Sequence, residues 1–260
     1  MKLNFITYGD GFFEKNKKKL LNTAVSSNWF TNCKAFGPET LDENFKNKYK
    51  NILSVKRGAG YWLWRPYILK RELNKMAEGD ILLSIDAGST LNIQGKKRFE
   101  EYIDILKNNK SGIISFQTKW IEKKYTTQEI FDYFQVDNDS DIANSGQITS
   151  LIFLIKNKNT VNLIDKFYNT IIHNPLLFTD HYNNKQHDYF IDNRHEQSVF
   201  SVLRKLNNPI LINDESWFGE PHGCFNGAKS KNYPFWTSRL SNKDPIRKPC
   251  KVDFISKNNL

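Results

Sequence analysis

The sequence predicts an α/β protein, and two observations support this fold class. Short runs of large aliphatic residues alternate along the chain with amphipathic stretches, which is the pattern of buried strands followed by surface helices. The run at 81–85 follows a Gly-Asp turn signal and is apolar apart from one serine, so it fits a strand buried on both faces of a sheet. With 260 residues, of which 39% are hydrophobic, the chain is long enough to bury a large core.

The first part of the chain reads as strand, turn and helix. The run at 3–8 predicts the first strand, and the Gly-Asp-Gly turn after it lacks the GxGxxG fingerprint of dinucleotide sites. The stretch 13–26 predicts an amphipathic helix that exposes the lysines within 15–19. Its expected inward residues are Leu20, Leu21, Ala24 and Val25. We also expect a strand within 29–36 and a short helix at 41–49.

The stretch 58–67, GAGYWLWRPY, is the most unusual in the chain. Its two glycines, four aromatic residues, arginine and proline cannot all serve one helix face. Proline is tolerated in the first turn of a helix, so Trp62, Trp64 and Arg65 should lie at or near the amino terminus of a helix that continues to residue 76. The amino terminus of a helix together with a guanidinium group can bind a diphosphate, because both attract negative charge. The alternative is an aromatic cluster packed under a loop, with Arg65 stacked on it.

The strand at 81–85 ends in Asp86, which is followed by Ala87 and Gly88. Open α/β sheets bind ligands at the carboxyl ends of their strands, and a glycine there lets a ligand approach the backbone closely. This places a candidate binding site at Asp86. The alternative is that Asp86 only caps the next turn.

The second half of the chain continues the alternation. The acidic stretch 137–141 lacks the spacing and glycine of an EF-hand, so we interpret it as a solvated turn. The segment 174–192 reads as a loop, and the many aromatic residues after 209 lack periodicity, which indicates a segment that wraps back over the domain or closes a cleft. The expected strands are 111–116, 148–155 and 210–212, and the expected helices are 96–108, 129–134, 160–173 and 199–206.

The net charge of +10 comes mainly from lysines spread along the chain. This charge is compatible with an anionic membrane, a phosphorylated substrate or nucleic acid as the partner. The alternative is that the charge only reflects a lysine-rich composition and has no functional meaning. The sequence contains no zinc finger, RNP motif or helix-turn-helix signature, so we expect no nucleic-acid partner. The three cysteines lack metal-ligand spacing and no apolar run spans a bilayer, so we expect a cytoplasmic protein. The basic stretch 243–257 either contacts a membrane surface peripherally or is a simple surface tail.

Three short motifs, taken in their order and spacing, resemble those of small bacterial and viral GT-A glycosyltransferases. They are GYWLWRP at 60–66, DAG at 86–88 and RHEQS at 194–198, and the resemblance covers residues 1–205. It implies a Rossmann-like, open, twisted mixed sheet flanked by helices. It also implies transfer of a hexose-type sugar from a nucleotide-sugar donor, expected to be a UDP-sugar. The implied acceptor is a glycan or lipid-linked glycan, such as a growing capsular polysaccharide or lipopolysaccharide.

On this resemblance we expect one domain over 1–260. Residues 1–110 would form the nucleotide-binding half, 111–205 the acceptor-side half, and 206–260 a loop-rich carboxyl-terminal segment. Glu196 would act as the catalytic base in an inverting enzyme, or would orient or stabilise the sugar in a retaining one. Asp86 would be the catalytic carboxylate of the donor site, while His195 is interpreted as a packing residue. The residues that would bind the donor are Thr7, Tyr8, Trp64, Arg65, Asp86, Ala87, Gly88, Asn144, Ser145, Gly146 and Gln147.

The resemblance also implies a divalent metal, Mn²⁺ or Mg²⁺, held by a DxD-type motif. Asp86 matches the first carboxylate, but Gly88 stands where the second would be. The metal would then be bound by Asp86 and His222 with the diphosphate, or Arg65 and nearby lysines would replace it. A cluster of His181, His187 and Asp188 is disfavoured because loop histidines lack fixed spacing. Two alternatives remain open: a non-catalytic nucleotide- or glycan-binding protein of the same fold, and a nucleotidyltransferase.

Overall fold

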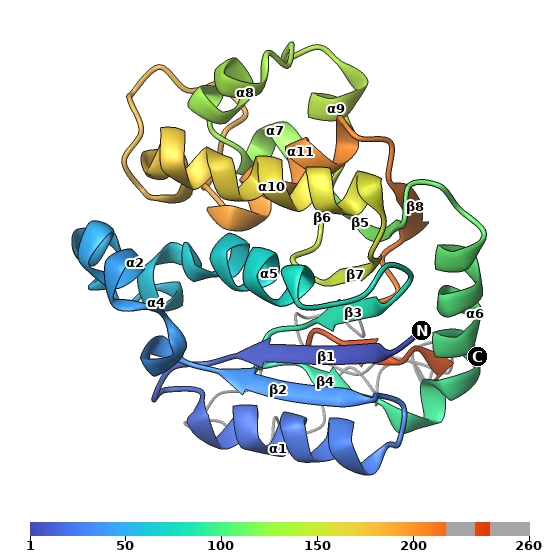
Figure 1. Ribbon diagram of the computed structural model, residues 1–260. Helices are drawn as coiled ribbons and strands as arrows, with labels where there is room; N and C mark the ends of the chain where they lie inside the picture. Colours follow the sequence, from blue (N-terminus) through green and yellow to red (C-terminus); the bar gives the residue numbers. More distant parts are fainter. Residues whose placement is uncertain (217–231, 240–260) are drawn as a thin grey trace, which may run out of the picture.

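A seven-stranded sheet with helices on both faces forms the centre of the computed structural model, which describes residues 1–216 and 232–239 (Figure 1). A separate ladder pairs β4 (Thr90–Leu91) with β9 (Phe235–Trp236). The strands of the main sheet are β1 (Leu3–Tyr8), β2 (Asn32–Phe36), β3 (Ile81–Ser84), β5 (Ile113–Ile121), β6 (Gly146–Ile148), β7 (Ile152–Ile155) and β8 (Ile210–Asn213).

The sheet is mixed. β2, β1 and β3 are parallel neighbours, β7 runs antiparallel to β3, and β5 pairs with β6 and β7 antiparallel and with β8 in parallel. The predicted α/β class with an open mixed sheet flanked by helices is confirmed. Because Ser84 pairs with Ile152, the carboxyl end of β3 meets the residues just before β7 at one edge of the sheet.

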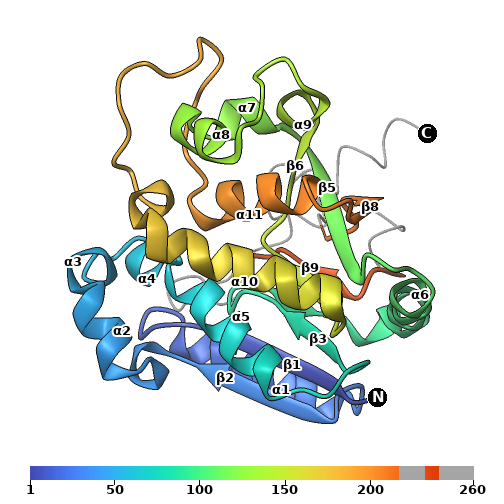
Figure 2. The ribbon, with the colours of Figure 1, turned by 45° about the horizontal axis from the view of Figure 1, so that its top comes forward.

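Helices cover both faces. On one face α5 and α10 run side by side, and on the other lie α1 and α6 (Figures 1 and 2). The helices are α1 (Glu14–Ser26), α2 (Glu43–Lys48), α3 (Lys50–Leu53), α4 (Gly58–Tyr61), α5 (Trp64–Asn74), α6 (Lys96–Lys107), α7 (Glu122–Tyr125), α8 (Gln128–Phe134), α9 (Asp141–Asn144), α10 (Lys158–His173) and α11 (Glu196–Lys205). Short 3₁₀ turns, η1 (Pro38–Thr40), η2 (Ile93–Gly95) and η3 (Pro175–Phe178), connect some of them.

The two faces of the sheet form two apolar cores. Successive side chains of a strand point to opposite faces, so Ile6 and Leu82 join the core under α5 and α10, while Phe5 and Leu83 join the core under α1 and α6. This double burial is why the run at 81–85 is aliphatic apart from Ser84, rather than alternating.

The buried stripe of α1 differs from the prediction. Leu20 and Ala24 are buried as expected, but Val25 is 58% exposed because it lies about 100° further around the helix than Ala24. Lys17, predicted outside, is buried. Its Nζ donates a hydrogen bond to the Gly9 carbonyl at 3.0 Å and lies 2.7 Å from a carboxylate oxygen of Glu14.

The apolar run 148–155, predicted as one strand, is interrupted at 149–151 and contributes to β6 and β7. Arg204 donates hydrogen bonds to the carbonyls of Thr149 and Leu151, the latter at 3.2 Å. These carbonyls face a buried cation instead of a neighbouring strand, which stabilises the break. The strand predicted at 111–116 continues further, to Ile121.

The segment after residue 209 wraps back over the domain as expected, in the part that the structure describes. Phe235 is 2% exposed and packs in the core under α1 and α6, and Asn92 N–H donates to the Pro234 carbonyl at 2.8 Å. Residues 217–231 and 240–260, with His222 and the stretch 243–257, lie outside the described residues. Within the described ranges, no helix combines the length and the apolar character needed to span a bilayer.

Candidate functional site

Asp86 lies just beyond the carboxyl end of β3, and its side chain is 39% exposed. One carboxylate oxygen accepts a hydrogen bond from Arg65 Nη2 at 2.6 Å, and the other lies 3.4 Å from the Ser150 hydroxyl. A partly exposed carboxylate is thus fixed at the strand end by a cation beneath it.

Arg65, in the first turn of α5, is that cation, and only 2% of its side chain is exposed. Nη1 donates to the Ser150 carbonyl at 3.1 Å, and Nε lies 3.1 Å from Glu196 Oε1, although it makes no well-directed hydrogen bond. The guanidinium also stacks on Trp64, 5.1 Å from the ring centre. Because these groups enclose it, Arg65 orients Asp86 and is not a cation offered at the surface.

Glu196, the first residue of α11, completes the buried charge cluster. It is 3% exposed, and Oε2 has no hydrogen-bond partner. Burial, with a smaller contribution from the negative charge of Asp86, raises the pKa of Glu196 to about 7, although Arg65 and Arg204 oppose this. Buried polar atoms without partners are rare in native proteins and mark strained or functional positions.

The turn before α5 is left-handed. All five residues from Gly58 to Trp62 have positive φ angles, of 60°, 50°, 91°, 53° and 58°. In this conformation each non-glycine residue costs about 1–2 kcal/mol, and Ala59, Tyr61 and Trp62 are three such residues. Backbone hydrogen bonds such as Tyr61 N–H to the Arg57 carbonyl, at 2.8 Å, hold the turn together.

His195 is where this turn meets α11. Tyr61 stacks on its ring at 4.8 Å and Trp62 lies 5.7 Å away. The backbone of His195 has φ 56° and ψ −123°, a conformation that normally needs glycine. Its Nε2 lies 2.8 Å from an Asp180 carboxylate oxygen, and burial lowers the pKa of His195 despite this contact. His195 is 1% exposed, so it packs at the helix start.

The three motifs found in the sequence are therefore in direct contact. Arg65 of GYWLWRP touches Asp86 of DAG and Glu196 of RHEQS, and the aromatic residues of the first motif pack on the histidine of the third. These contacts join a helix start, a strand end and a second helix start, and they place the Asp86 carboxylate at the edge of the sheet where ligands bind in open α/β folds.

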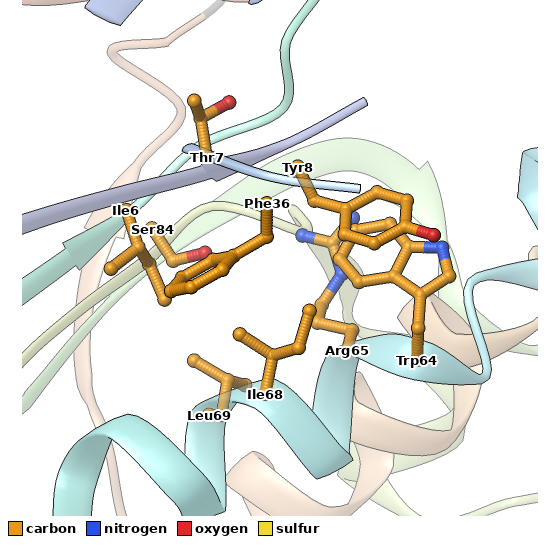
Figure 3. A pocket seen from close by; sticks show the side chains of 9 residues that line it. All are labelled: Ile6, Thr7, Tyr8, Phe36, Trp64, Arg65, Ile68, Leu69 and Ser84. Carbon is orange, nitrogen blue, oxygen red and sulfur yellow. The ribbon is translucent and has the colours of Figure 1, made fainter. Parts of the chain in front are cut away.

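Tyr8 and Trp64 close the space next to this cluster. Their rings stack with centroids 3.7 Å apart, and burial is the main cause that raises the pKa of Tyr8. The cavity around them measures about 10 Å³, enough for about one water molecule. The Thr7 side chain points to the opposite face of the sheet from Tyr8 (Figure 3). The residues that line the cavity are Ile6, Thr7, Tyr8, Phe36, Trp64, Arg65, Ile68, Leu69 and Ser84.

Ala87 and Gly88 lie where other segments approach closely. A Cβ added to Gly9 would lie 3.0 Å from the Ala87 Cβ, so the loop after β1 passes directly beside the turn after β3. Ser238 Oγ donates to the Gly88 carbonyl at 3.4 Å. The carboxyl-terminal segment thus reaches the turn that carries Asp86.

The predicted Asn-Ser-Gly-Gln turn lies further away. Asn144 and Ser145 hydrogen-bond within 138–145 and, through the Ser145 carbonyl, with Glu122 N–H, so the structure does not bring them to Asp86. Gly146 is part of β6, where a Cβ would clash with the Thr118 carbonyl. Gln147 is linked to α11, because Gln197 Nε2 donates to its Oε1 at 3.2 Å.

Sequence reasoning missed several polar residues around the cluster. Arg204 lies four residues after Phe200 on the buried face of α11, and this helical spacing is a signal that could have marked it. Burial lowers the pKa of Arg204 to about 9. Glu122 is fully buried, and Lys205 Nζ lies 2.8 Å from its Oε2. The residues not predicted are Glu122, Ser150, Asp180, Arg204 and Lys205.

The side chains that the structure describes around Asp86 do not by themselves form a metal site. Among residues 1–216 and 232–239 no group of three or more His, Cys, Asp or Glu side chains could hold a metal ion. At Asp86 the guanidinium of Arg65 already occupies one carboxylate oxygen with a positive charge. Since His222 lies outside the described residues, the predicted metal stays a prediction, and we assign it no step.

Comparison with known proteins identifies the fold. No protein-family profile and no curated protein matches the chain. Among solved structures, a glycosyltransferase involved in glycosylation of the major capsid of PBCV-1 matches with a TM-score of 0.53 and 12% identity, over 94% of this chain and 97% of that one. The chain therefore has a glycosyltransferase-type fold. Apo mouse xyloside xylosyltransferase 1 matches with a TM-score of 0.45 and 10% identity, over 95% of this chain and 100% of that one, and no argument rests on it.

Proposed function

We propose that the protein is a glycosyltransferase that takes a sugar from a nucleotide-sugar donor, a UDP-sugar, and transfers it to a growing surface glycan. Capsular polysaccharide or lipopolysaccharide is the proposed acceptor. The contact of Arg65 with both Asp86 and Glu196, at the carboxyl end of β3 in a glycosyltransferase-type fold, is the observation that supports this proposal most strongly.

The proposed donor site is the edge formed by Asp86, Ala87 and Gly88 with the loop after β1. Transfer of the sugar places negative charge on the departing diphosphate and positive charge on the sugar ring. A carboxylate at the strand end can orient and stabilise the ring, provided that its own position is fixed. The buried guanidinium of Arg65 supplies that fixation, so we assign Asp86 the role in contact with substrate and Arg65 a positioning role.

Glu196 remains our candidate for the base that accepts the proton of the acceptor hydroxyl. A pKa of about 7 suits a general base near neutral pH. The side chain is 3% exposed, so the acceptor reaches it only if the residues that cover it move. We further propose that the protein acts in the cytoplasm, where its basic surface would suit anionic, lipid-linked acceptors at the membrane.

A ligand screen followed by a turnover assay tests the proposal. The thermal midpoint of the full chain is measured with nucleotides and nucleotide sugars, each with and without manganese, because a ligand that binds only the folded chain raises the midpoint. Donor hydrolysis is then measured for the wild type and for Asp86→Asn. Asp165→Asn is the matched control, because Asp165 is also about 41% exposed and lies 3.0 Å from a cation, Lys70.

We expect a UDP-sugar to raise the midpoint and to be hydrolysed by the wild type and by Asp165→Asn, with a large loss in Asp86→Asn. Nucleotide binding without turnover would favour the non-catalytic alternative, and release of pyrophosphate would favour a nucleotidyltransferase. A chain that responds to no nucleotide would refute the donor site.

A further inference from the structure

A patch of aromatic residues and cations surrounds α7, beside the cluster described above. Trp120, at the end of β5, is 44% exposed, and Tyr189, in the loop between α10 and α11, is 58% exposed. That loop runs beside α7 and α8 (Figure 2), and Ile191 N–H donates to the Lys124 carbonyl at 2.8 Å. Trp120 also packs edge-on against Tyr125 at 6.0 Å. Segments far apart in the sequence thus build one surface.

Each of the three rings carries a cation. Lys119 Nζ lies 5.2 Å from the centre of the Trp120 ring, and Lys123 Nζ lies 5.2 Å from that of Tyr189. The guanidinium of Arg194 lies 4.8 Å from the Tyr125 ring. We call these six residues the α7 patch. Single exposed aromatic side chains are ordinary, but two exposed rings and one buried ring, each paired with a cation, are not explained by chance exposure.

Two carboxylates beside the patch bind other cations more closely. Asp192 lies 3.9 Å from Arg194 but closer, at 3.3 Å, to Arg57, which also contacts Asp180. Glu122, at the base of α7, is buried and paired with Lys205. The patch therefore presents two exposed rings, those of Trp120 and Tyr189, beside the cations Lys123 and Arg194.

The patch is joined to the start of α11. Ser198 Oγ donates to the Tyr125 carbonyl at 2.6 Å and accepts from Arg194 N–H at 3.0 Å. Arg194 precedes Glu196 by two residues. A chain molecule bound on the α7 patch would therefore end near the Arg65–Asp86–Glu196 cluster.

We propose that the α7 patch binds an acidic glycan, an extended sugar chain that carries carboxylate or phosphate groups. The C–H face of a sugar ring is apolar and packs on Trp120 and Tyr189, while Lys123 and Arg194 bind the anionic groups. That the bound glycan is the acceptor of sugar transfer rests on the proposed function. That the α7 patch binds an acidic glycan does not. We favour a glycan over a nucleic acid because the patch adjoins the cluster to which an acceptor must extend.

The test measures binding of polygalacturonate oligomers to the full chain by isothermal titration calorimetry, with neutral dextran oligomers and an oligo-dT strand as comparisons. The double variant Trp120→Ala/Tyr189→Ala removes the two exposed rings, and Lys123→Gln removes one positive charge. Tyr133→Ala, on a 37% exposed tyrosine of α8, and Lys97→Gln, on α6, are the matched controls. Thermal midpoints verify that each variant is folded.

We expect the wild type and both controls to bind polygalacturonate, and each patch variant to bind it about tenfold more weakly, which corresponds to about 1.4 kcal/mol. Dextran should bind more weakly than polygalacturonate. Equal binding by folded patch variants, no binding by the wild type, or patch-dependent binding of oligo-dT alone would each overturn the inference. The measurement contains no nucleotide, so its result is independent of whether the chain turns over a donor.

Discussion

Replacing Glu196 by glutamine tests the electrostatics of the buried cluster directly. The carboxyl lies against Arg65, yet burial dominates and raises its pKa from 4.5 to about 7. The folded chain therefore holds this proton more tightly than the unfolded chain. Stability from Glu196 is fully present below about pH 4.5 and is lost as the pH rises to about 7, by a total of about 3 kcal/mol.

Glutamine has almost the same shape as a protonated glutamate but does not titrate. Glu196→Gln should therefore match the wild type near pH 5 and become the more stable protein at higher pH. The difference in unfolding free energy should change by about 2 kcal/mol between about pH 5 and about pH 8. Urea denaturation at a series of pH values measures it, because the effects of all other groups cancel between the two proteins.

Glu72→Gln is the matched control, since Glu72 is equally buried on the neighbouring helix α5. Burial opposes ionisation there too, but hydrogen bonds from Lys34 and Lys75 outweigh it and lower the pKa of Glu72. Its variant should lose stability relative to the wild type as the pH rises from acid to neutral. If Glu196→Gln followed the same direction, or showed no pH dependence, the attraction of Arg65 would outweigh burial and our account of the cluster would be wrong.

Three further predictions concern single contacts. Asp86→Asn should lower donor hydrolysis by at least about a hundredfold and should also lower the thermal midpoint, because it removes the carboxylate that pairs with the buried Arg65 guanidinium at 2.6 Å; a folded variant with full activity would contradict the site. Trp64→Ala should destabilise the fold by about 3–5 kcal/mol in urea, whereas Tyr8→Phe, which keeps the stacked ring, should cost under about 1 kcal/mol. Ala59→Gly should stabilise the left-handed turn by up to about 1 kcal/mol. Gly60→Ala should destabilise it, because a Cβ at residue 60 would lie 2.7 Å from Leu53 Cα. Equal effects of the two substitutions in urea denaturation would contradict the strained turn.

The local elements could be predicted because they depend on local patterns. The aliphatic run at 81–85 and the small polar residues after it predict a buried strand that ends at Asp86, and the structure confirms the strand. The break at 149–151 could not be predicted this way. The break depends on Arg204 of helix α11, which donates hydrogen bonds to the carbonyls of Thr149 and Leu151.

The candidate site was predictable in its residue types but not in its contacts. Gly58 and Gly60 indicate unusual backbone, yet nothing local predicts that Ala59, Tyr61 and Trp62 share the left-handed conformation. That turn depends on packing against His195, far along the chain. Likewise the spacing of RHEQS shows a charged helix start, but only the fold shows that burial sets the ionisation of its glutamate.

Phe235 has a consequence for how the molecule is made. Its ring lies 6.0 Å from Phe99 and 5.7 Å from Phe153, and it closes a core whose other members come mostly from the first 155 residues. A chain emerging from the ribosome cannot complete this core until residue 235 has been synthesised. Until then Phe99 and Phe153 lack their cover, and a nascent or prematurely terminated chain exposes an apolar surface that chaperones or other such chains would bind.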